Sequence, residues 1–307
     1  MARKLQPRGI KRTVGDWVFD SFNTAFMIAI FIIMIYPFWY CIILSFNDPL
    51  DYYKGPLFLW PRVFSLENYQ FVLQGKNFGV ATFNSIARTI TGTILHCVIT
   101  GAAAYGLSKK HLMLRGVYTK IFVFTMFFGG GMIPGYLLIR ALGMLDTFWV
   151  YIIPSCFSFY NAILFMAFYD SIPASLEESA RIDGATLPTI FFKIIFPVSK
   201  PIFATIALYQ IVGQWNAWMD TLLYTKGDHL MTLQAILMRL IKVADNIIEM
   251  LKTMSSVGGV QADMASRITP VAIRVAAMVI TTFPIVVVYP FFQKYFVKGI
   301  MLGSVKE

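Results

Sequence analysis

Six long stretches without a charged side chain dominate the pattern of apolar and polar positions along the chain. Each has about the length that a helix needs to cross a lipid bilayer, roughly 20 residues. Apolar residues follow one another continuously within them instead of alternating over about ten positions, so the pattern predicts spanning helices and not the strands of a barrel. The six predicted spans are residues 22–46, 89–108, 121–139, 147–169, 201–219 and 275–293.

The basic residues between these stretches predict the orientation of the chain. An even number of spans places both termini on the same side of the membrane. If that side is the cytoplasm, the inner segments hold 15 Lys and Arg in 78 residues and the outer segments hold 11 in 104. Cytoplasmic loops carry the excess of basic residues, so we expect both termini to be cytoplasmic. The outer segments are then residues 47–88, 140–146 and 220–274.

Composition excludes most other classes of protein. Hydrophobic residues make up 57% of the 307 positions and charged residues only 14%, whereas a soluble domain has roughly 25% charged residues. The many aromatic residues exclude a disordered chain. The net charge of +10 fits basic residues at cytoplasmic membrane edges better than a nucleic-acid partner. The sequence therefore predicts an all-α polytopic membrane protein with a basic cytoplasmic segment at 1–21, a transmembrane domain at 22–298 and a cytoplasmic tail at 299–307.

The inner segment between the fourth and fifth predicted spans has a distinct helical pattern. Ser175 followed by Glu178 has the spacing of a capping box, which predicts the start of a helix. Glu177 and Arg181 lie four positions apart, a spacing at which opposite charges support a helix. Gly184 predicts the end of this helix, because glycine readily adopts the left-handed conformation of a helix terminus.

A second short helix is predicted directly after the first. Pro188 suits the first turn of a helix that starts near Thr186, and Pro197 is expected to end it. Apolar residues at helical spacing give this second helix one apolar face. Residues 172–197 thus predict a helix-turn-helix at the cytoplasmic surface, with carboxylates on its first helix and a form suited to docking into another protein.

The same loop resembles the EAA loop of bacterial ABC importer permeases. That loop reads Glu-Ala-Ala, three residues, Gly, nine residues, Ile, one residue and Leu-Pro. This chain differs from it at two positions, where Ser179 replaces an alanine and Phe196 replaces the leucine. The matching positions are Glu178, Ser179, Ala180, Gly184, Ile194, Phe196 and Pro197. The segments 181–185, 214–218, 292–299 and 303–306 are similar to the form seen in carbohydrate-uptake permeases, and most closely to the second permease subunit of the maltose-type family. The stretch 129–135 and the long outer segment before the last span resemble the branch for oligosaccharide or polysaccharide uptake.

This resemblance implies a division of labour among subunits. A permease of this family pairs with a second homologous permease, above a cytoplasmic dimer of ABC ATPases, and receives solute from an extracytoplasmic binding protein. ATP and Mg would be bound by the ATPase subunits, since this chain has no phosphate-binding GxxxxGK[ST] pattern and no catalytic residue is expected in it. Alternating access would be driven by ATPase closure, in the cytoplasmic membrane of a bacterium.

The resemblance also implies which residues couple the permease to the ATPase. They belong to the helix-turn-helix, and Glu178 and Gly184 have a structural interpretation as well, as helix cap and helix terminator. The two roles are compatible, because an ordered coupling helix needs its ends fixed. The predicted coupling residues are Glu177, Glu178, Ser179, Ala180, Arg181, Asp183, Gly184, Ile194 and Pro197.

Residue types in the spans suggest a path for a sugar. Sugars stack on aromatic rings and bond through their hydroxyls to amides and carboxylates. The alternative for each of these side chains is packing between helices, or anchoring at the membrane interface for the tryptophans. The candidates are Asn84, Tyr160, Asn161, Tyr209, Gln210, Gln214, Trp215 and Asn216.

Two other classes of membrane protein fit less well. An ion-coupled secondary transporter tends to carry acidic residues inside its spans, and none of the six stretches contains one. A membrane-embedded hydrolase would need a nucleophile with a base, or metal ligands. His96, His111 and His229 are scattered along the chain, so no metal site is expected.

Overall fold

The computed structural model describes residues 13–75, 77–256 and 270–304. Within these ranges the chain is helical, with one isolated antiparallel bridge between Asn47 and Phe64 in place of a sheet, which confirms the all-α prediction. The α-helices are α1 (Val14–Ser45), α2 (Glu67–Leu73), α3 (Phe78–Ser108), α4 (Arg115–Phe127), α5 (Met132–Ala141), α6 (Phe159–Tyr169), α7 (Ala174–Ile182), α8 (Leu187–Ile190), α9 (Phe196–Val198), α10 (Lys200–Asn216), α11 (Met219–Tyr224), α12 (Leu233–Ser256) and α13 (Pro270–Ser304). Three 3₁₀-helices are η1 (Asp51–Lys54), η2 (Phe148–Tyr151) and η3 (Ile153–Ser155), and η4 (Phe191–Ile195) is a π-helix.

The described helices offer between three and six membrane spans. Three are long and apolar enough by themselves: α1, α3 and the part Val271–Phe292 of α13. Three bent pairs pass the same test only if each is one span, and their bends measure 116° between α4 and α5, 48° between Phe148–Ser155 and α6, and 83° between Leu187–Val198 and α10. The described residues thus contain helices that are long and apolar enough to span a membrane, and the number six rests on counting each bent pair once.

The boundaries of the predicted spans differ from the structure at several places. The predicted span 121–139 is interrupted between Phe127 and Met132, because Gly131 has φ +84° and the glycine triplet before α5 does not continue the helix. The predicted span 201–219 ends at Asn216. Helix α3 begins at Phe78, eleven residues before its predicted start, so part of the predicted outer segment is helical. Hydropathy had excluded that first part because it contains Arg88.

The chain forms two compact units, and the first comprises residues 1–70 with 261–279. At the end of α1 the chain folds into a small cap that is held by polar side chains. Arg62 Nε donates to Asp51 Oδ2 at 2.7 Å, and Asn47 Nδ2 donates to the same oxygen at 3.1 Å. The hydrogen bond from Arg62 lowers the pKa of the Asp51 carboxyl below its ordinary value, and the hydrogen bond from Asn47 adds a smaller shift in the same direction. The part of the predicted outer segment that forms this cap is therefore ordered.

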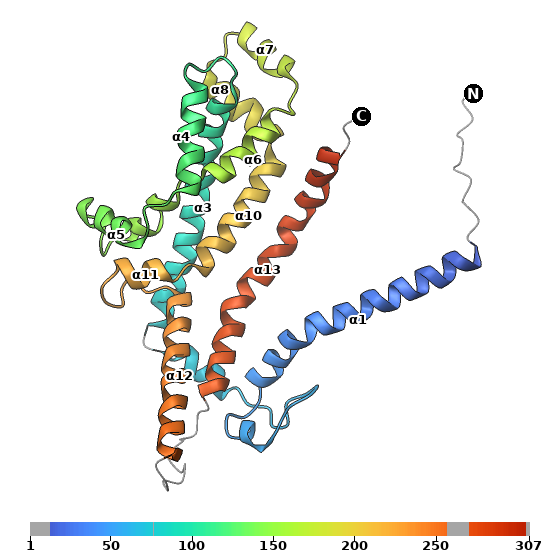
Figure 1. Ribbon diagram of the computed structural model, residues 1–307, viewed down its shortest axis with the longest axis vertical. Coiled ribbons are helices and arrows are strands. Elements are labelled where there is room, and N and C mark those ends of the chain that lie inside the picture. Colours follow the sequence, from blue (N-terminus) through green and yellow to red (C-terminus); the bar gives the residue numbers. More distant parts are fainter. Residues whose placement is uncertain (1–12, 76, 257–269, 305–307) are drawn as a thin grey trace. The chain divides into compact units, whose positions relative to one another are not determined.

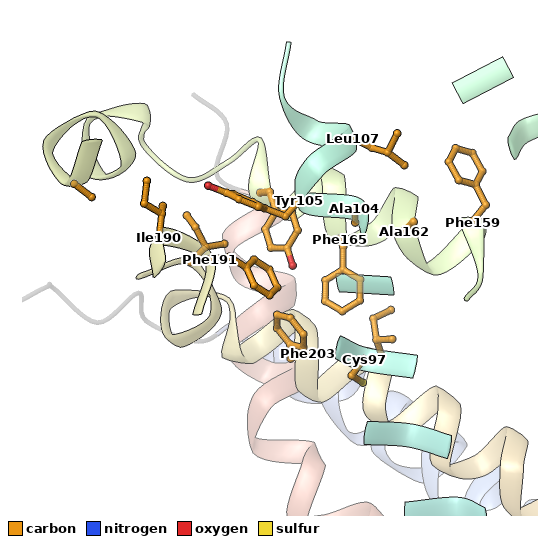
Figure 2. Packing of buried hydrophobic residues seen from close by; sticks show 14 residues of the cluster. Cys97, Ala104, Tyr105, Leu107, Phe159, Ala162, Phe165, Ile190, Phe191 and Phe203 are labelled. Carbon is orange, nitrogen blue, oxygen red and sulfur yellow. The ribbon is translucent and has the colours of Figure 1, made fainter. Parts of the chain in front are cut away.

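The second unit comprises residues 71–260 with 280–307 and is organised around α3. Figure 1 shows α3 lying beside α6 and α10, with α7 and α8 at one end of this bundle and α12 at the other. Aromatic side chains fill the space between these helices. Phe165 of α6 lies 4.7 Å, centroid to centroid, from Phe203 of α10, and Figure 2 shows both within the cluster of buried residues.

Two glycines let α10 approach α3 closely. A β-carbon at Gly101 would lie 2.8 Å from Phe203 Cζ, and one at Gly92 would lie 2.9 Å from Gln214 Nε2. Both distances are shorter than a β-carbon tolerates, so a larger residue at either position would require the side chain of Phe203 or Gln214 to shift. This close approach places the polar side chains of α10 against α3.

Candidate functional site

The first candidate site is the inner loop, residues 172–197. Its first helix, α7, begins at Ala174 with Pro173 as the N-terminal flanking residue and no side-chain cap. Ser175 therefore lies inside the helix, and the predicted capping box of Ser175 and Glu178 is wrong. Proline before the first turn explains this, because its fixed φ already suits the entry into a helix.

The end of α7 follows the prediction for Gly184. Gly184 has φ +78°, its N–H donates to the Arg181 carbonyl at 3.0 Å, and the Ala185 N–H donates to the Ala180 carbonyl at 2.9 Å. This pair of bonds is a Schellman motif, which satisfies carbonyls that a helix end would otherwise leave open. Ala180 is buried and Ala185 packs against the same cluster, so the motif also fixes the turn to the core.

The second arm of the loop has nearly the predicted extent. It starts with α8 after Thr186, with Pro188 in its first turn as predicted. It continues through the π-helix η4 and α9 and ends at Val198, one residue after Pro197. The chain bends by 83° only where Ser199 joins this arm to α10. Ile194 is half-buried and Pro197 is exposed.

The outward surface of α7 is uncovered in this chain. It carries mixed polar and apolar side chains, and Ile182 is 86% exposed. Ala180 is the only buried residue of α7. The exposed members of the predicted coupling set are Glu178, Ser179, Arg181, Asp183, Gly184 and Pro197.

Glu177 differs from the other predicted coupling residues. It is half-buried and forms an ion pair with Lys109, the residue that follows α3. The sequence had suggested Arg181 as its partner, because a local spacing of four is visible in a sequence and a partner 68 positions away is not. Glu177 therefore faces the bundle while Glu178 faces outward.

The second candidate site is a polar pocket of about 290 Å³ in the second unit. Charged and amide groups line it, together with two tyrosines, and residues from α3, α10, α11 and the η2–η3 turns contribute. Its polar lining residues are Arg88, Tyr151, Ser155, Gln210, Gln214, Asp220 and Tyr224. A larger cavity of about 610 Å³ between α3, α10 and α13 is almost wholly apolar and is unsuited to a sugar.

Arg88 is the central residue of the pocket wall. Its side chain is 2% exposed and makes five hydrogen bonds, as many as a guanidinium has N–H groups. The acceptors are Gln214 Oε1 at 3.1 and 3.0 Å, the Ala217 carbonyl at 3.3 Å, and the two Asp220 carboxylate oxygens at 3.2 and 2.5 Å. Arg88 also lies 4.3 Å over the Tyr151 ring.

Sequence reasoning missed Arg88, which had been assigned no role at a span border. A usable signal was present, because one basic residue near a predicted span and one acidic residue near another predict a buried pair. Gln214 completes the arrangement by donating from Nε2 to Ser155 Oγ at 2.6 Å. Arg88, Gln214 and Asp220 thus join α3 to the end of α10 and the start of α11.

The structure separates the predicted sugar-path residues into three groups. Gln210 and Gln214 line the polar pocket. Three others bond to neighbouring segments: Asn84 donates to the carbonyls of His229 and Met231 at 2.9 Å, Asn161 contacts His96 Nε2 at 2.9 Å, and Trp215 donates to the Thr281 carbonyl at 2.8 Å. The remaining three are exposed on the described surface: Tyr160, Tyr209 and Asn216.

Comparisons with known proteins place this arrangement in context. A family model described as "Binding-protein-dependent transport system inner membrane component" matches residues 1–302. Protein LplC of Bacillus subtilis (strain 168) is 37% identical over 295 residues, 96% of this chain and 97% of the relative. The polygalacturonan/rhamnogalacturonan transport system permease protein YtcP of the same organism is 35% identical over 291 residues, 94% of this chain and 98% of the relative.

A solved structure agrees with these relatives. It is described as a bacterial ABC transporter involved in the import of the acidic polysaccharide alginate. One of its chains has a TM-score of 0.80 and 28% sequence identity, over 94% of this chain and 99% of that chain. The likeness therefore extends over nearly the whole of both chains.

Proposed function

Because the chain belongs to the family of binding-protein-dependent transport system inner membrane components, we propose that it is the permease subunit of an ATP-driven importer for an oligosaccharide or polysaccharide fragment. The observation that carries the proposal is the match over 80–94% of the chain to permeases named for carbohydrate transport. An ion-coupled secondary transporter finds no support in these relatives.

The chain is a membrane subunit and not an enzyme, as the family indicates. ATP hydrolysis belongs to a separate subunit, and in our proposal ATP and Mg bind there. The transporter would contain this chain, a second homologous permease, a dimer of cytoplasmic ABC ATPases and an extracytoplasmic binding protein. In our proposal the chain has six spans in the cytoplasmic membrane of a bacterium, as the family description as an inner membrane component supports. The distribution of basic residues favours cytoplasmic termini.

We assign the inner loop to the contact with the ATPase. Its support is the exposed surface of this loop, on which Ile182, Leu187 and Phe192 are large apolar residues exposed beside polar side chains. Several exposed apolar residues that lie among polar groups are typical of a docking surface. The rigid end of α7 at Gly184 would keep this surface in one geometry while the ATPase moves.

We assign the sugar path to the polar pocket beside Arg88. Gln210 and Tyr224 line it with groups that bond to sugar hydroxyls, and Asp220 keeps 22% of its side chain exposed there. Arg88 uses its N–H groups within the wall, so its role is to hold the pocket residues in place.

Uptake by cells tests the proposal. Cells that lack this chain are expected to lose uptake of at least one labelled oligosaccharide from a panel, and the chain supplied from a plasmid should restore it. Depletion of cellular ATP should stop that uptake, whereas an ionophore that collapses ion gradients at constant ATP should leave it unchanged. Uptake that follows the ion gradient instead would contradict the proposal.

A further inference from the structure

Lys109 lies where α3 meets the inner loop. It is the residue directly after the helix, with 19% of its side chain exposed. Its Nζ donates to the Glu177 carboxylate of α7 and lies 4.0 Å from the centroid of the Tyr105 ring. One ammonium group thus binds an anion on one side and an aromatic face on the other.

This ion pair differs from an ordinary surface pair. Glu177 has 18% of its side chain exposed, so both partners are largely removed from water and are screened less than exposed charges. The neighbouring lysine, Lys110, is exposed. Removal of one partner would leave the other charge half-buried without its counter-charge, which lowers the stability of the folded protein.

Tyr105 connects the lysine to the core of the bundle. Its ring packs edge-on against Tyr169 of α6 at 5.9 Å and lies 5.3 Å from the ring of Phe191 in η4. Figure 2 shows Tyr105 beside Phe191 within the buried cluster. The Lys109 ammonium therefore sits at the place where α3, α6, α7 and η4 meet.

Helix α7 has few other ties to the bundle. Ala180 is its only buried residue, and the cluster it joins is shared with η4 and α6. The ion pair is a direct charged link between α7 and α3. Within the same helix α3, ten residues after its start at Phe78, Arg88 is bonded to the residues of the polar pocket. The 21 residues from Arg88 to Lys109 correspond to about 30 Å of helix.

We propose that Lys109 is a positioning residue for transport, which fastens α7 to α3 so that a displacement of α7 moves the wall of the polar pocket. The proposal rests on the proposed function, since α7 is displaced only if an ATPase engages it. The ion pair stays closed during the cycle, and α7 and the end of α3 move together.

A charge exchange in the complete transporter tests this role. The variants are Lys109→Glu, Glu177→Lys and the double exchange Lys109→Glu/Glu177→Lys, and Lys110→Glu is the matched control with the same change of charge one position away. The transporter with its ATPases, sister permease and binding protein is reconstituted in liposomes. Sugar molecules taken up are counted per ATP hydrolysed, at equal amounts of assembled complex.

We expect each single variant to lower the number of sugars per ATP by about fivefold or more, as loss of a coupling interaction predicts. The double exchange should recover most of the loss, and Lys110→Glu should match the unmodified chain. A purely structural role would lower assembly without changing the ratio. Lys109→Gln, which keeps a long polar side chain, should change the ratio in the same direction if charge reversal prevents assembly.

Two results would overturn the assignment: an unchanged ratio in Lys109→Glu and Lys109→Gln, or a double exchange no better than the single variants. An unmodified complex without any ATP-driven uptake would instead contradict the proposed function, and the role of Lys109 with it.

Discussion

Arg88 lies inside an apolar helix, and every N–H of its guanidinium has an acceptor there. A single charged residue interrupts a hydropathy pattern, so the sequence alone suggests a span border at this position. Its acceptors Gln214 and Asp220 follow 126 and 132 positions later, which no local pattern reveals. The same limitation applies to Glu177 and Lys109. At the scale of residues, the end of α7 at Gly184 was predicted from local sequence, the start of α7 was predicted wrongly, and the distant partners of Arg88 and Glu177 were missed.

Replacement of Arg88 is expected to destabilise the protein strongly. Arg88→Leu leaves the partly buried Asp220 carboxylate without its counter-charge, which costs about 3–5 kcal/mol when one member of a buried pair is removed. The double variant Arg88→Leu/Asp220→Leu should lose less, because it leaves no unpaired charge. Thermal unfolding of the purified protein in detergent measures both, with the exposed Arg140→Leu as control. A double variant less stable than Arg88→Leu would contradict this account of the pair.

Replacement of Gly184 is expected to affect transport without affecting insertion. Its φ of +78° is a left-handed conformation, which costs other residues roughly 1–2 kcal/mol and a β-branched residue more. Gly184→Val should therefore distort the end of α7 and abolish ATP-driven uptake, while the amount of chain in the membrane stays the same. Gly116→Val is the control, because Gly116 has open space around it in α4. Normal uptake by Gly184→Val would show that this turn is not needed for coupling.

At the scale of elements, the sequence predicted the helices well and their interruptions poorly. The pattern of hydropathy located α1, α3 and α13, since each is a single long apolar helix. It placed the glycine triplet at 129–131 inside one predicted span. A hydropathy window averages over such a break, whereas the bend of 116° between α4 and α5 depends on the backbone of a few residues. Breaks of this kind require buried or wet surroundings, which the sequence does not display.

The close approach of α3 and α10 provides a test at this scale. Gly101→Ala would place a β-carbon 2.8 Å from Phe203 Cζ, so overpacking should destabilise the bundle by about 1–3 kcal/mol. Gly106→Ala in the same helix has open space and should be neutral or slightly stabilising. Thermal unfolding compares the two variants. Addition of Phe203→Leu should recover stability only in Gly101→Ala, and equal stability of the two alanine variants would contradict the packing described here.

At the scale of the whole molecule, the functional class was accessible from the sequence because one loop carries a specific spacing of Glu, Gly, Ile and Pro. The family match over residues 1–302 and the TM-score of 0.80 agree with that reading. The sugar path was less accessible, because amides and aromatic rings in membrane helices serve packing as readily as binding. Of the predicted sugar-path residues, Asn84, Asn161 and Trp215 bond to neighbouring segments, and only Gln210 and Gln214 line the polar pocket.

The central claim is that this chain forms the membrane path of an importer whose energy comes from ATP hydrolysed by a partner. The most direct measurement is sugar uptake into liposomes that hold the purified transporter and ATP inside, with loaded binding protein outside. We predict uptake that requires this chain, the ATPases, internal ATP and the binding protein together, and no ATP hydrolysis by this chain when it is purified alone. Hydrolysis by the isolated chain, or uptake that an ion gradient drives without ATP, would contradict the claim.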